Sequence, residues 1–76
     1  MTFLVTRYAK ADDTPDAETD VSSVDAEAFA RLLGIPVSRL ADVYPLKPEH
    51  SAGLRELTGM DLDLDRFDYF LEVAAD

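Results

Sequence analysis

Residues 66–73 read RFDYFLEV, and this stretch decides the fold of the chain. Its side chains alternate between two sets with a period of two residues, which is typical of a β-strand and not of a helix. The stretch therefore predicts a strand with two different faces. One face carries Phe67, Tyr69, Leu71 and Val73, and the other carries Asp68, Phe70 and Glu72.

Phe70 is the exception to this alternation, because it is an aromatic residue on the acidic face. It is either covered by a helix or exposed as an aromatic anchor among carboxylates. We expect the covered arrangement, because buried aromatic rings dominate small cores. The exposed arrangement would suit recognition of a basic protein, since aromatic side chains are frequent anchors of interfaces. Tyr44 has the same two interpretations.

The residues just before this strand match part of a calcium-binding loop. Asp61, Asp63, Asp65 and Glu72 occupy the first, third, fifth and twelfth places of an EF-hand loop. The sixth place, where glycine allows a sharp turn, is Arg66. The leucines between the aspartates fit instead an extended segment that turns its apolar side chains inward. We keep calcium binding as a third hypothesis.

Upstream of residue 60, the pattern predicts a helix preceded by a short strand. Pro48 is suited to the first turn of a helix that carries Leu54 and Leu57 on its apolar side and ends at Gly59. Residues 43–46 (VYPL) predict a brief extended segment, and its proline favours the edge of a sheet.

The N-terminal half predicts a hairpin and a first helix. Residues 2–8 (TFLVTRY) are rich in β-branched and aromatic residues and predict a first strand. A turn-forming stretch, KADDTP at residues 10–15, leads to a second strand that we place at residues 18–24. A helix is predicted over residues 25–33, and Gly34 ends it.

These elements predict a single α+β domain over residues 1–76. Their order is β-β-α-β-α-β, with two helices on one face of a small, mainly antiparallel sheet. Seventy-six residues are too few to build two cores, because a shared core would leave neither unit with enough buried apolar surface.

The charge of the chain predicts the kind of partner. Sixteen acidic residues against seven basic ones give a formal net charge of -9. Such a potential repels nucleic acid and anionic membranes and accelerates encounter with a basic protein. The N-terminus lacks the basic and apolar regions of a signal peptide, so we expect a cytoplasmic protein.

The sequence offers no motif that predicts catalysis or a cofactor. Cysteine is absent, and the three glycines are isolated, so the chain has no thiolate site and no glycine-rich phosphate loop. His50 and Ser51 are adjacent, and neighbouring side chains diverge on a helix, so they cannot act as base and nucleophile. We therefore expect a binding protein and not an enzyme.

Residues 43–74 resemble a group of short, acidic, uncharacterised bacterial proteins, and the predicted first strand and first helix resemble them more loosely, so the similarity covers most of the chain. The similarity is carried by the YPL segment at residues 44–46, by Asp61–Leu62–Asp63, and by DYFLE at residues 68–72. Members of this group look like immunity partners of polymorphic or contact-dependent toxins. The resemblance implies a cytoplasmic protein that binds a cognate toxin domain, and it brings no catalytic residues.

Together, charge and resemblance favour an immunity-type inhibitor that binds a basic toxin domain, such as a nuclease, and blocks its active site. The alternative is an accessory or regulatory module that uses the same surface without inhibiting a toxin. The residues that we expect to contact the partner are Asp42, Tyr44, Asp61, Asp63, Asp65, Asp68, Phe70 and Glu72.

Overall fold

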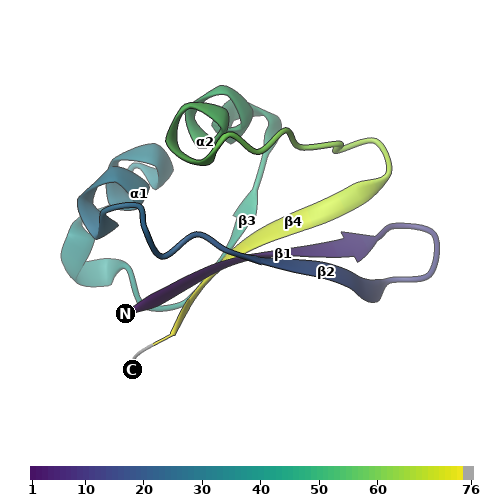
Figure 1. Cartoon of the computed structure of the whole chain (residues 1–76), viewed down its shortest axis with the longest axis horizontal. Helices are drawn as coiled ribbons and strands as arrows, with labels where there is room; N and C mark the ends of the chain where they lie inside the picture. Colours follow the sequence, from purple (N-terminus) through teal and green to yellow (C-terminus); the bar gives the residue numbers. More distant parts are fainter. Residues whose placement is uncertain (75–76) are drawn as a thin grey trace.

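The computed structural model describes residues 1–74 and contains one four-stranded antiparallel sheet (Figure 1). The strand order is β2-β1-β4-β3, so the first and last strands of the chain pair at the centre of the sheet. The strand predicted from the RFDYFLEV stretch is thus a central strand. The four strands are β1 (Thr2–Ala9), β2 (Thr14–Asp20), β3 (Val43–Leu46) and β4 (Phe67–Ala74).

Both α-helices lie on the same side of the sheet (Figure 1). They are α1 (Ala26–Leu33) and α2 (Ser51–Thr58), and the short 3-10 helices η1 (Val37–Arg39) and η2 (Pro48–His50) accompany them. The predicted α+β class and the order β-β-α-β-α-β are confirmed. In the part of the chain that the structure describes, no helix has the length and apolar character needed to cross a membrane.

The second strand lies earlier in the chain than we predicted. It covers Thr14–Asp20 instead of residues 18–24. Every residue of β2 is exposed, so no apolar alternation marks it, and its pairing with β1 alone defines it. The hairpin loop is short because Asp13 adopts a left-handed conformation (φ 53) and donates its N–H to the Ala9 carbonyl at 2.8 Å. Val21, which we placed in the strand, is buried in the core.

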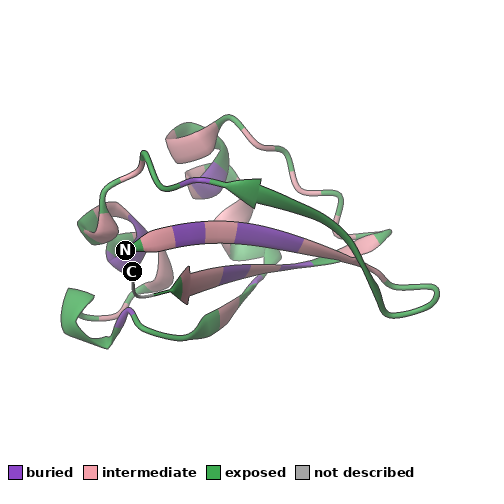
Figure 2. Cartoon of the chain, turned by 60° about the horizontal axis from the view of Figure 1, so that its bottom comes forward, coloured by how far each residue is buried: buried purple, intermediate pink, exposed green. Residues whose placement is uncertain are grey.

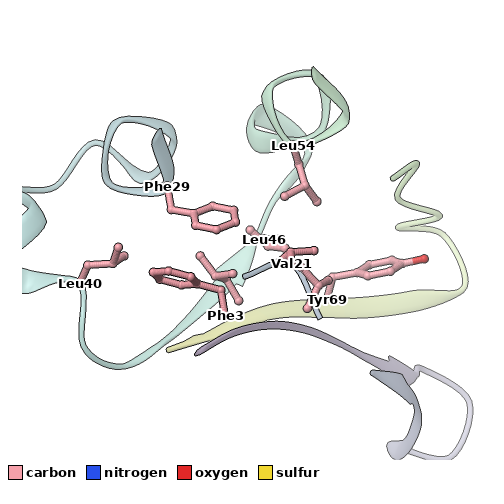
Figure 3. Close-up of a cluster of buried hydrophobic side chains, with 9 residues drawn as sticks. Phe3, Val21, Phe29, Leu40, Leu46, Leu54 and Tyr69 are labelled. Carbon is pink, nitrogen blue, oxygen red and sulfur yellow. The ribbon is translucent and has the colours of Figure 1, made fainter. Parts of the chain in front are cut away.

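The hydrophobic core fills the space between the sheet and the helices (Figure 3). Phe3 and Phe29 meet there with ring centroids 5.0 Å apart. Purple buried positions alternate with less buried ones along part of the central strands (Figure 2), as expected for a sheet covered on one face. The most deeply buried large side chains are Phe29, Leu40, Leu54, Leu71 and Val5.

Segment 60–66 connects α2 to β4 and contributes to the same core. Leu62 and Leu64 pack against the buried cluster, while the three aspartates that alternate with them are exposed. This confirms the inward orientation of the two leucines that the alternation predicted.

Gly59 ends α2 with a left-handed backbone (φ 78), as its position predicted. We expect Gly59→Ala to lower the free energy of unfolding by about 1 kcal/mol, because a Cβ disfavours this conformation. Gly59→Asn should lose less, since asparagine tolerates the left-handed region. Urea denaturation followed by far-UV circular dichroism measures both. Equal stability of the alanine variant and the wild type would contradict this role of Gly59.

Candidate functional site

The register of β1 and β4 places a set of side chains on the sheet face that has no helix. Thr6 pairs with Phe70, and Tyr8 pairs with Asp68, so these side chains share one face. Val5 pairs with Leu71 on the opposite face, inside the core. We call the first surface the helix-free face. It comprises Leu4, Thr6 and Tyr8 of β1, Glu18 and Asp20 of β2, Val43 and Pro45 of β3, and Asp68, Phe70 and Glu72 of β4.

Phe70 lies on the helix-free face, so our expectation that a helix covers it is wrong. The ring is only partly buried and does not belong to the hydrophobic core. Its ring centroid lies 5.6 Å from that of Tyr8, at an interplanar angle of 85°. Edge-to-face pairs of this kind are favourable beyond the area that they bury. Both helices cover the opposite face, because that face carries the larger apolar surface.

A groove of about 300 Å³ runs beside this aromatic pair. We call it the aromatic groove. Tyr8, Phe70 and Val43 supply its apolar surface, and a second depression of about 470 Å³ adjoins it towards β2. Thr6, Tyr8, Asp13, Val43, Asp68, Phe70 and Glu72 line the aromatic groove.

Carboxylates surround the aromatic groove on several sides. Asp13 comes from the hairpin loop, whereas Asp68 and Glu72 come from β4 on either side of Phe70. Asp68 faces the Lys10 ammonium at 3.8 Å, and an exposed pair at this distance is weak. The helix-free face therefore combines an aromatic centre with an acidic rim, which suits a partner that carries basic groups.

Three of the predicted contact residues, Asp68, Phe70 and Glu72, are together on the helix-free face. Asp42 lies just before β3, where it organises the backbone. Its Oδ1 accepts a hydrogen bond from the Val43 N–H at 2.9 Å, and its carbonyl accepts one from the Val73 N–H at 3.1 Å.

Tyr44 lies on the opposite side of the sheet from Phe70. It packs against the core, and its hydroxyl donates to the Arg39 carbonyl and accepts from the Ala41 N–H at 3.3 Å. The ring and hydroxyl thus hold the 39–41 loop against β3. Of the two interpretations of Tyr44, the structure supports packing against the core.

Asp61, Asp63 and Asp65 lie in the segment that leads into β4, and all three are exposed. Asp61 faces Arg55 at 3.2 Å on the helix side of the molecule, and Asp63 faces Arg66 at 3.8 Å. Glu72 points to the helix-free face instead. The described residues contain no group of three or more His, Asp or Glu side chains arranged to hold a metal ion. The EF-hand spacing therefore does not correspond to a converging set of ligands.

Tyr8 and Asp13 are candidate contact residues that sequence reasoning missed. Tyr8 continues the alternation in which Phe3 and Val5 point inward, so the pattern of β1 already placed it outward. Its position beside Phe70 depends on the register between the two ends of the chain, which local patterns do not reveal. Asp13 reaches the groove because of the hairpin conformation.

Arg7 contacts both a carboxylate and an aromatic ring, and it lies on the helix side of the sheet. A hydrogen bond from its guanidinium Nε to Asp16 Oδ2 at 2.6 Å raises the pKa of Arg7. The guanidinium also lies over the Phe67 ring, with 4.3 Å between the guanidinium carbon and the ring centroid. This contact ties β1 to β2 and β4.

Asp20 closes β2, and hydrogen bonds from Ser22, including one from its N–H at 2.8 Å, lower the pKa of Asp20 below 3.8. The ionised form is thus favoured in the native state. The ionised carboxylate therefore stabilises the native state above pH 3.8. This stabilisation is lost as the pH falls through the lower pKa of Asp20 in the native state. We expect Asp20→Asn to lower the melting temperature at neutral pH, with a difference from wild type that shrinks in acid.

Thermal melts between about pH 7 and pH 2.5 measure this difference. Asp65→Asn is the control, because Asp65 is an exposed loop carboxylate. A difference between wild type and Asp20→Asn that stays constant with pH would contradict the role of the ionised carboxylate.

The comparisons with known proteins identify a family but no function. The model of a domain of unknown function, DUF7683, matches residues 2–72. This range includes β1, β2 and β3 completely and most of β4. Among curated proteins, no significant match is found.

Proposed function

We propose that this chain, which belongs to the DUF7683 family, is an immunity-type inhibitor that binds and neutralises a cognate basic bacterial toxin domain. The helix-free face would cover the active site of the toxin, for example that of a nuclease. The observation that carries this proposal is the Tyr8–Phe70 aromatic pair, which stands outside the core and is surrounded by carboxylates.

The charge of the chain supports a basic partner. The net charge of -9 belongs to a domain of only 8.4 kDa, and five acidic residues line the aromatic groove and the adjoining depression. Such a field accelerates association with a basic protein and opposes contact with nucleic acid. A nuclease domain that binds nucleic acid through a basic surface has the complementary charge.

The two edges of the sheet support binding through the face and not through strand addition. Edge strands β2 and β3 each contain a proline, Pro15 and Pro45, which cannot donate a backbone hydrogen bond. Charged residues along β2 further disfavour pairing with another strand. The partner is therefore expected to contact side chains of the face.

Co-expression with the product of the neighbouring gene tests the proposal. We expect that product to arrest growth when expressed alone, and growth to recover when this chain is co-expressed. The purified proteins should form a complex whose association rate falls about tenfold or more between low and high salt. A complex without growth arrest or rescue would favour the accessory-module alternative. Absence of both rescue and complex would refute the proposed function.

A further inference from the structure

The aromatic groove has the chemical character of a site for one cationic side chain. Its apolar surface is formed by Tyr8, Phe70 and Val43, and three carboxylates stand around it. Its volume of about 300 Å³ corresponds to roughly ten water molecules, which is enough for one long side chain. An aliphatic stem would contact the rings while its charged end meets the carboxylates.

We infer that the aromatic groove binds an arginine side chain of the partner. This inference rests on the proposed function, because it assumes that the partner is a basic protein. Arginine fits better than lysine for two reasons. Its planar guanidinium stacks on aromatic rings and is less strongly hydrated than an ammonium group, and its several N–H donors can reach carboxylates on different sides.

The chain already uses this chemistry on the other side of its sheet. The Arg7 guanidinium lies over the Phe67 ring and donates to the Asp16 carboxylate. The aromatic groove offers a guanidinium the same two kinds of partner. Phe70 supplies the ring, and Glu72 supplies the carboxylate. The difference is that in the aromatic groove the guanidinium would come from the partner.

A second copy of this chain is a poor occupant of the groove. Docking two helix-free faces would bring the acidic residues of one copy, which include Asp68, Glu72 and those of β2, towards the acidic residues of the other, and like charges repel at an interface. Among the residues that line the groove there is no basic one. Charge complementarity therefore selects a different, basic protein.

Nuclear magnetic resonance titration tests the inference without the toxin. The probes are N-acetyl-arginine N-methylamide and the matching lysine compound, each added to the full chain labelled with nitrogen-15. We expect saturable shifts at the Tyr8, Phe70 and Glu72 amides with the arginine probe. Its affinity should be in the millimolar range, about threefold or more above that of the lysine probe.

Two variants separate the aromatic and the acidic contributions. Phe70→Leu keeps an apolar side chain, and it should weaken arginine binding by about threefold or more. The double variant Asp68→Asn, Glu72→Gln should weaken it by a similar factor. The matched control is Glu27→Gln, Glu49→Gln, which removes the same charge from exposed positions on the helix side and should leave binding unchanged.

Equal binding of both probes, or shifts spread over all acidic segments, would overturn the inference. So would unchanged binding in both groove variants, whose folding is checked by the dispersion of their amide spectra. These outcomes do not depend on growth rescue. A chain that rescues growth but does not select arginine would refute the inference alone. A chain that selects arginine but does not rescue growth would refute the proposed function alone.

Discussion

Phe70→Ala is expected to weaken binding of the cognate partner by about 30-fold to 1000-fold. This range corresponds to the loss of about 2 to 4 kcal/mol that truncation of a central aromatic anchor produces. The physical reason is that Phe70 stands at the centre of the helix-free face, in contact with Tyr8 and between Asp68 and Glu72. Surface plasmon resonance with the immobilised partner measures the change, which should appear mainly as faster dissociation.

The control for this variant is Val37→Ala. Val37 is an apolar residue with 47% of its surface accessible, but it lies in η1, away from the strands of the helix-free face. It should bind the partner as the wild type does. Phe70→Ala should remain folded, because its ring is outside the core and the loss of the Tyr8 contact costs about 1 kcal/mol. Normal affinity of a folded Phe70→Ala protein would exclude the helix-free face as the binding surface.

Phe29→Ala is expected to remove most or all of the stability of the fold at room temperature. Phe29 is fully buried between α1 and the sheet, where it contacts Phe3. Truncating a buried phenylalanine to alanine costs about 3 to 5 kcal/mol. A core of this size supplies about 5 kcal/mol of net stability or less, so about 2 kcal/mol at most would remain. Far-UV circular dichroism with urea denaturation measures the loss, since the chain has no tryptophan.

Phe29→Leu should retain most of the stability, because it keeps an apolar side chain in the same space. The exposed variant Val37→Ala should be close to the wild type. A Phe29→Ala protein with a urea midpoint near that of the wild type would show that the core between α1 and the sheet contributes little to folding.

Local sequence patterns predicted most of the elements correctly. Residues 66–73 alternate with a two-residue period, and residues 2–8 are rich in β-branched and aromatic residues; both form strands close to the predicted bounds. Gly34 and Gly59 end the two helices, as glycines with left-handed backbones commonly do. These features depend on a few neighbouring residues, so a single sequence contains the necessary information.

The second strand shows where local patterns fail. Residues 14–20 read TPDAETD, a mainly polar segment with a proline in which only the two threonines favour a strand. It forms because β1 offers unpaired backbone groups and the short hairpin loop brings the chain back along them. The more β-branched segment that follows turns away instead, and Val21 enters the core.

The candidate site was predicted only in part, for a related reason. Asp68, Phe70 and Glu72 share one strand face, so their alternation predicted their common orientation. Tyr8 is more than 60 positions away in sequence, and only the antiparallel register of β1 and β4 brings it beside Phe70. Asp61, Asp63 and Asp65 are close in sequence to these residues, but the segment that carries them follows α2 on the helix side.

By itself, the sequence of this protein determined the strand and helix periods, the helix ends, the acidic charge and the two different faces of residues 66–73. Each of these is a property of neighbouring residues or of composition. Only the tertiary structure decided which face the helices cover and which residues accompany Phe70 on the other. Helices cover the face with the larger apolar area, and strand register pairs residues from opposite ends of the chain, so both outcomes depend on the whole fold.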